Sequence, residues 1–198
     1  MSYHRKLPLN PDKKLQAYII GVALGDGNLS NPNGRATRLR VSCDKKYPQL
    51  FDHIRKSLQF LLPKNKVSFV HRSKNCVDVS VFSNHLQKLL GWDSHGGSKY
   101  KQNVSIPNWI KKDKNLVKEC LRELFQTDGS IYNDRKYLMV NFVNTATKLS
   151  ADVFVMLKRL GYHPNMQELK QKNNKIKHTI RISRDSQKFI EEIDYWKK

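Results

Sequence analysis

Residues 19–27 read Ile19-Ile20-Gly21-Val22-Ala23-Leu24-Gly25-Asp26-Gly27 and complete an apolar segment that begins near Leu15. The segment is apolar on nearly every side, which predicts a buried helix over Leu15–Gly25. Asp26-Gly27 ends this helix, and glycine suits the left-handed turn that often follows a helix. Gly21 and Gly25 are four residues apart and share one helix face, so a second helix is expected to pack closely there.

A second copy of this pattern lies further along the chain. Residues 121–131 read Leu121-Arg122-Glu123-Leu124-Phe125-Gln126-Thr127-Asp128-Gly129-Ser130-Ile131, and they predict a helix over Val117–Thr127 that again ends in Asp-Gly. The stretches 83–90 and 183–190 also match each other, from a shared serine through Gln-Lys to two apolar residues. A repeat of about 100 residues is too long for a solenoid and indicates two pseudo-symmetric subdomains.

The segments between the motifs follow the same order of elements in both halves. In the first half, strand-like alternation at 37–43 precedes a helical pattern at 50–61 that Pro63 stops; alternation returns at 67–69 and 77–81, and a short helix follows at 85–90. The second half predicts a strand at 138–142, a helix at 149–160, a strand at 176–182 and a closing helix near 189–193. This order predicts an α+β fold. We expect subdomains at residues 1–95 and 116–198, joined by a linker at 96–115.

The composition narrows the class of partner. The chain has 198 residues and a formal net charge of +20, which predicts a polyanionic partner such as DNA, RNA or an anionic membrane. No apolar run reaches the roughly 20 residues that a membrane helix needs, and the N-terminus lacks the apolar core of a signal peptide. We therefore expect an intracellular protein with no membrane partner that works where its host genome lies, and the sequence leaves open cytoplasm, nucleoid or organelle matrix.

The cysteines and histidines give no sign of a disulfide framework or a zinc site. Cys43, Cys76 and Cys120 are odd in number and show no CxxC spacing, and seven histidines are scattered without an HExxH motif. We expect the three thiols to be reduced and mostly buried.

The two motif segments resemble the LAGLIDADG motif of homing endonucleases. Gly96-Gly97-Ser98-Lys99, followed by Ile106-Pro107, is similar to the linker of single-chain, double-motif members of the intron-encoded type. The resemblance implies two αββαββα subdomains with saddle-shaped antiparallel sheets, and motif helices packed at a pseudo-dyad. It also implies a monomer that makes a staggered double-strand break in a long DNA site, uses Mg²⁺, and accepts Mn²⁺ or Ca²⁺ for binding. The implied partner is double-stranded DNA, with no obligate protein partner.

The resemblance places the metal-binding residues at the two motif ends. If the helices cross at the pseudo-dyad, Asp26 and Asp128 converge, and two adjacent carboxylates at negative helix ends are unfavourable without a cation. Hard divalent ions take such oxygen ligands. We therefore expect Asp26 and Asp128 to hold metal, aided by the backbone carbonyls of Gly25 and Thr127. For either motif alone, Asp-Gly can also be a simple helix stop.

The sequence identifies the residues that would assist the two metal-binding aspartates less sharply than the aspartates themselves. Lys99 resembles the lysine that stabilises charge or orders water in this family, although a basic residue here can equally contact only phosphate. Cys43 lies where several members carry a polar residue, so Ser42 or Asn144 is expected to hold water instead.

The second motif departs from the family pattern. Glu123 stands where the motif has glycine and Thr127 where it has alanine, while Leu24 and Gln126 replace the first aspartate of the motif. A glutamate at a close helix crossing costs desolvation unless it is paired. We therefore expect unequal packing of the two motif helices.

The polar positions of the alternating strands, and those just after the motifs, predict the DNA-facing surface. They are Asn28, Ser30, Arg38, Arg40, Ser42, Lys66, Ser68, Arg72, Asp78 and Ser80 in the first half, and Ser130, Tyr132, Asn141, Lys170, Lys177, Thr179 and Arg181 in the second. Such sheets can lie in successive major grooves, where arginine prefers guanine edges and asparagine adenine edges. Because the two halves differ, we expect a non-palindromic site.

Two other functions fit the same fold. An intron RNA maturase or a non-cleaving DNA-binding protein would use the same basic surface. Neither requires both Asp26 and Asp128, and their joint presence favours cleavage.

Overall fold

The computed structural model describes residues 8–73 and 75–194, with the side chains of residues 72 and 73 left out. The first subdomain contains, in order, α1 (Lys13–Gly25), β1 (Gly27–Ser30), β2 (Arg38–Asp44), α2 (Pro48–Leu61), β3 (Val67–Ser73), β4 (Cys76–Phe82) and α3 (Leu86–Leu90). The short helix α4 (Asn108–Lys111) lies in the linker. The second subdomain contains α5 (Lys114–Asp128), β5 (Gly129–Asp134), β6 (Tyr137–Asn144), α6 (Thr147–Arg159), β7 (Asn165–Lys170), β8 (Ile176–Ile182) and α7 (Ser186–Glu192).

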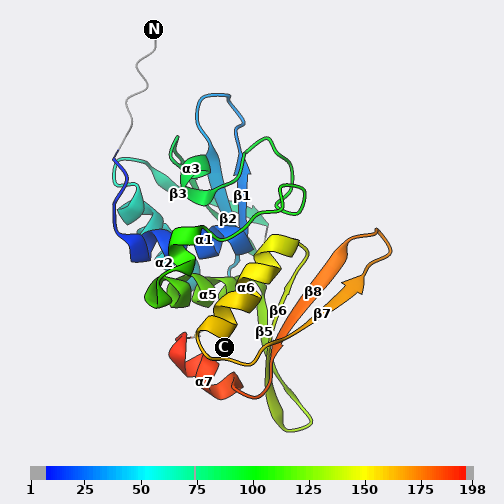
Figure 1. Cartoon of the computed structure of the whole chain (residues 1–198). Coiled ribbons are helices and arrows are strands. Elements are labelled where there is room, and N and C mark those ends of the chain that lie inside the picture. Colours follow the sequence, from blue (N-terminus) through cyan, green and yellow to red (C-terminus); the bar gives the residue numbers. More distant parts are fainter. Residues whose placement is uncertain (1–7, 74, 195–198) are drawn as a thin grey trace.

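Both subdomains have the same sheet topology. The strand orders are β1-β2-β4-β3 and β5-β6-β8-β7, and every pairing is antiparallel. The motif helices α1 and α5 lie side by side between the two sheets, and the β7–β8 hairpin extends away from the helices (Figure 1). The predicted α+β fold of two pseudo-symmetric αββαββα subdomains is confirmed.

Alternation along the strands explains which face of each sheet meets the helices. Leu39, Val41 and Val79 are fully buried in the first sheet, and their counterparts Val140, Phe142 and Ile180 are fully buried in the second. Burial of one apolar face fixes the register, since a slip by one residue would turn that face to solvent.

Aromatic packing completes the core of the second subdomain. Phe125 of α5 contacts Phe142 of β6 and Phe189 of α7, with ring centroids 5.5 and 4.7 Å apart. The motif helix is thereby fixed to both its sheet and the closing helix.

The glycines after the motif aspartates do not form left-handed turns, and that expectation was wrong. Gly27 and Gly129 begin the strands β1 and β5, and neither has positive φ. A Cβ at Gly27 would lie 2.5 Å from the Ala23 backbone oxygen, and one at Gly129 would lie 2.9 Å from Phe125 Cα. Glycine is required at both positions because each strand starts against the last turn of the preceding helix, where a side chain would clash with the helix backbone.

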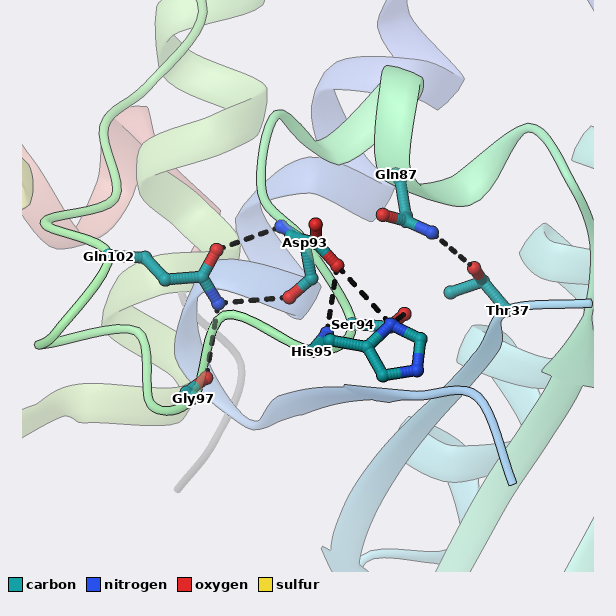
Figure 2. A network of polar contacts seen from close by, with 7 residues as sticks. All are labelled: Thr37, Gln87, Asp93, Ser94, His95, Gly97 and Gln102. Carbon is teal, nitrogen blue, oxygen red and sulfur yellow. Dashed lines mark hydrogen bonds and ion pairs between the residues drawn. The ribbon is translucent and has the colours of Figure 1, made fainter. Parts of the chain in front are cut away.

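The linker is a folded segment. The side chain of Gln102 accepts a hydrogen bond from Asp93 N and donates to Asp93 O and Gly97 O, at 2.8, 2.9 and 3.1 Å (Figure 2). These bonds close a loop over residues 93–102. Asp152 of α6 anchors the following residues, accepting from Ile106 N at 2.8 Å and Lys111 Nζ at 2.7 Å. The loop therefore has a defined position relative to the second subdomain.

Within the described part of the chain, Cys43, Cys76 and Cys120 form no disulfide, and Cys43 and Cys120 are buried. Among the described residues, no helix is long and apolar enough to cross a bilayer.

Candidate active site and nucleic-acid interface

Each of the two glycines on α1 accommodates a larger residue of α5. A Cβ at Gly21 would lie 2.6 Å from Cys120 O and 3.0 Å from Glu123 Cβ. A Cβ at Gly25 would overlap the Thr127 side chain, whose hydroxyl donates to Glu123 O and Leu124 O at 3.0 Å. The unequal packing expected from the sequence is therefore complementary, with small residues on one helix and larger ones on the other.

Gly25→Ala is expected to destabilise this helix pair by about 1–3 kcal/mol, the usual cost of overpacking a tight contact. Urea unfolding measures the loss. Thr127→Ala should restore part of it, because the clashing Oγ1 and Cγ2 atoms disappear. Additive effects of the two substitutions would contradict the assigned contact.

The same packing brings the two motif aspartates to one end of the helix pair. Asp26 is the C-terminal cap of α1 and is exposed, and Asp128 is the last residue of α5 and is half-buried. Asp128 Oδ2 accepts a hydrogen bond from Asn144 Nδ2 at 2.8 Å, while Asn144 Oδ1 accepts from Ala146 N at 2.8 Å. Of the two residues expected to hold water, Asn144 lies beside a motif aspartate.

Lys99 extends from the linker loop onto the end of α1. Its ammonium donates to the carbonyl oxygens of Ala23, Leu24 and Gly25, at 3.3 Å for Ala23 and 2.6 Å for Leu24. Burial lowers the pKa of Lys99, and the negative charges of Asp128 and Asp26 partly offset that effect. The three charged groups therefore form one cluster, held by residues from both subdomains and the linker.

The donor set of this cluster fits a hard divalent ion. Carboxylate and carbonyl oxygens are the ligands that Mg²⁺ prefers, and Mg²⁺ commonly uses one or two carboxylates with water and phosphate oxygens. Among residues 8–73 and 75–194, no group of three or more His, Cys, Asp or Glu side chains has metal-binding geometry. Lys99 already holds a positive charge against the Gly25 carbonyl, so an ion bound to that oxygen would share it with Lys99 or displace the ammonium.

Glu123 lies inside the helix interface. Its side chain is 1% exposed, and Oε1 accepts from Arg122 Nε at 3.1 Å, whereas Oε2 has no hydrogen-bond partner. Desolvation raises the pKa of Glu123 to about 7, and the Arg122 guanidinium opposes the rise. The ionised carboxylate therefore costs folding free energy at neutral pH.

Glu123→Gln is expected to stabilise the protein above pH 7. The folded-state pKa lies above the ordinary value of 4.5, so wild-type stability is highest below that pH and falls as pH rises to about 7. The loss is roughly 3 kcal/mol, from about 1.4 kcal/mol per pKa unit. Denaturant unfolding at pH 4.5 and pH 8 measures it; an equal effect of the substitution at both pH values would contradict a buried, titrating Glu123.

The strand pairings define the outward face of the first sheet. Asn28, Arg40 and Ser80 lie side by side across β1, β2 and β4, as do Ser30 and Arg38 across β1 and β2. Ser68 pairs with Ser80 on the same face, and Lys66 is exposed just before β3. The side chain of Arg72 lies outside the described residues.

Asp78 differs from its predicted place at the surface. Its side chain is fully buried, beneath contacts with Arg40 and Ser42, whereas Ser42 itself is exposed. Ser80 is also largely buried, at 7% exposure. Alternation gives the face of these residues correctly but does not show that long neighbouring side chains cover them.

The outward face of the second sheet also agrees with the prediction, with one correction. Ser130, Tyr132, Asn141, Thr179, Lys177 and Arg181 share this face. Lys170 does not: it is in phase with Met166 and Glu168, on the opposite face of β7. Gln167, which pairs with Thr179, and Asn165, which pairs with Arg181, occupy the outward positions instead. The sequence of β7 lacks apolar alternation, so only its register with β8 reveals them.

Comparison with known proteins gives a family match for residues 115–194 and a fold match for nearly the whole chain. Residues 115–194 match the LAGLIDADG-like domain family. The crystal structure of I-DmoI in complex with DNA and Mn is similar, with 19% identity, a TM-score of 0.67 and coverage of 91% of this chain and 96% of that chain. Mesophilic variants of the homing endonuclease I-DmoI match with 20% identity, a TM-score of 0.67 and coverage of 91% and 89%.

A structure of a differently named protein has the same fold. The N-terminal LAGLIDADG domain of DUF199/WhiA matches with 15% identity and a TM-score of 0.61, covering 96% of this chain and 88% of that chain. No curated protein matched the sequence. At these identities the solved structures establish a shared fold. Residues 115–194 therefore match a LAGLIDADG-like domain, and nearly the whole chain shares the two-subdomain fold of these solved structures.

Proposed function

We propose that this protein is a monomeric, site-specific endonuclease that makes a staggered double-strand break in a long, non-palindromic DNA target. The observation that carries the proposal is the pair of carboxylates, Asp26 and Asp128, at adjacent ends of α1 and α5, with the Lys99 ammonium close enough to interact electrostatically with both. The similar structures of I-DmoI with DNA and Mn, and with DNA and Ca, support DNA and divalent ions as ligands.

Asp26 and Asp128 would hold the metal, with Gly25 and Thr127 contributing carbonyl oxygens. When bound, divalent ions supply Lewis-acid activation of water and stabilise charge on a scissile phosphate. Asn144 holds the Asp128 carboxylate in place at 2.8 Å. This support is asymmetric, because Cys43 occupies the β2 position that corresponds to Asn144 in β6.

Lys99 would act beside the metal ligands. Its part-buried ammonium remains attracted to both motif carboxylates, so it can stabilise negative charge that develops on phosphate at either strand. The loop closed by the hydrogen bonds of Gln102 (Figure 2) contains Lys99, and the Lys99 ammonium reaches the carbonyl oxygens of Ala23 and Leu24 at the end of α1.

A cleavage selection from a randomised duplex library, with Mg²⁺ present, tests the proposal. The expected product is one long, non-palindromic consensus with staggered ends. Enrichment of bound but uncut DNA would instead favour a non-cleaving DNA-binding protein. Binding of structured RNA without enrichment of any duplex would favour the maturase function.

A further inference from the structure

One arginine on the outward face of the first sheet is tied to a buried acid. Arg40 Nε of β2 lies 3.6 Å from Asp78 Oδ2 of β4, and the Asp78 side chain is 0% exposed. Ser42 Oγ donates a hydrogen bond to Asp78 Oδ1 at 2.6 Å. The carboxylate thus lies beneath two residues of the surface expected to meet DNA.

The second sheet contains a corresponding arrangement. Arg181 Nε of β8 donates to Asn141 Oδ1 of β6 at 3.3 Å, and Asn141 Nδ2 donates to Tyr132 Oη at 2.8 Å. Asn141 is 9% exposed, so its amide is also nearly covered. Again a nearly buried polar side chain contacts an arginine through Nε.

The strand registers show that the two arginines occupy the same cross-strand pair. Gly27 pairs with Val41 and Gly129 with Phe142, which makes Arg40 and Asn141 equivalent positions. Arg40 pairs with Ser80, and Asn141 pairs with Arg181. Each half therefore presents one guanidinium at this pair, from β2 in the first half and from β8 in the second.

A buried carboxylate is an unexpected group on such a surface. It repels phosphate, and its burial costs free energy unless opposite charge and hydrogen bonds offset that cost. Arg40 and Ser42 both supply such contacts to Asp78. Because Asp78 lies against the Nε edge, the guanidinium fork formed by Nη1 and Nη2 is left for a ligand. Among the described residues, neither fork of Arg40 or Arg181 makes a hydrogen bond within the protein.

We propose that Asp78 is a specificity-positioning residue: it orients Arg40 to read one base pair in the first half of the DNA target. The inference rests on the proposed DNA function. Bidentate contact of an arginine fork with a guanine edge discriminates bases only if the fork is aimed into the groove. Asn141 orients Arg181 in the same way for the second half, with a neutral group in place of a charged one.

The charge of Asp78 gives a distinctive expectation. Asp78→Asn removes a negative charge from a DNA-facing surface, so affinity for unrelated duplex should rise. The same substitution loosens Arg40, so preference for one base pair should fall about tenfold, within the range of a bidentate contact. A residue that only supports folding would not raise general affinity while relaxing a single position.

The experiment compares binding to the selected target with binding to a set of duplexes that each change one base pair. Asp44→Asn is the matched control, because Asp44 is an exposed carboxylate on the same face of β2 and is paired with Lys46 at 3.6 Å. It should raise general affinity without changing the base-preference profile. Arg40→Lys should lose preference at the same base pair as Asp78→Asn, and combining the two should add no further loss.

An unchanged profile in either Asp78→Asn or Arg40→Lys would overturn the inference while leaving site-specific binding intact. If Asp78→Asn proved unfolded by thermal melting, Asp78→Ser would be measured in its place, with the same loss of preference expected at the same base pair. Failure of the wild-type protein to bind any duplex specifically would instead overturn the proposed function, and this inference with it.

Discussion

Asp26→Asn and Asp128→Asn should each reduce double-strand cleavage by on the order of 10³-fold, while DNA binding remains. Metal-assisted stabilisation of the transition state is worth several kcal/mol, and each 1.4 kcal/mol is about a factor of ten in rate. The two residues end adjacent helices, so neither variant disturbs the helix interface formed around Gly21 and Gly25.

Cleavage and binding should be measured separately on the selected duplex. Single-turnover cleavage in Mg²⁺ reports the chemistry, and affinity measured without cleavage reports the surface. Asp52→Asn on α2 is a suitable control, because Asp52 pairs with Arg55 and Lys56 within its own helix. Wild-type cleavage rates in both motif variants would refute the metal-binding role of these aspartates.

Affinity for the target should fall by about 10³-fold between 50 and 200 mM salt, as expected for a protein that makes six or more phosphate contacts. The physical reason is release of counterions from the duplex when basic side chains neutralise phosphates. The formal net charge of +20, and the basic residues on both outward sheet faces, favour a large number of such contacts.

The slope of log affinity against log salt checks this expectation directly. Lys177→Ala removes one positive charge from the outward face of the second sheet. It should reduce the magnitude of the slope by about 1, the value expected for the loss of one phosphate contact. A slope near zero for the wild-type protein would show that phosphate contacts do not dominate binding and would contradict the assignment of these faces.

The duplication and most strands follow directly from the sequence pattern. Alternation at 37–43, 77–81 and 176–182 predicts strands that the structure contains, because one face of each must be apolar to cover the helices. Alternation does not predict β7, because this strand projects beyond the core and buries little. Its two apolar residues, Met166 and Leu169, lie on opposite faces of an otherwise polar strand and give no alternating pattern.

The site itself was only partly predictable. The motifs place Asp26 and Asp128 at helix ends, but the position of Lys99 depends on the loop closed by Gln102, which no periodicity reveals. Burial of Asp78 likewise depends on tertiary contacts, because alternation specifies a face but not the side chains that cover it.

The most direct test of two working carboxylates in one chain is strand-resolved cleavage of the selected duplex, with each strand labelled separately. Wild-type protein in Mg²⁺ should break both strands at positions offset from each other, and chelation of the metal should stop both breaks. A break confined to one strand, or binding with no break at all, would contradict the account.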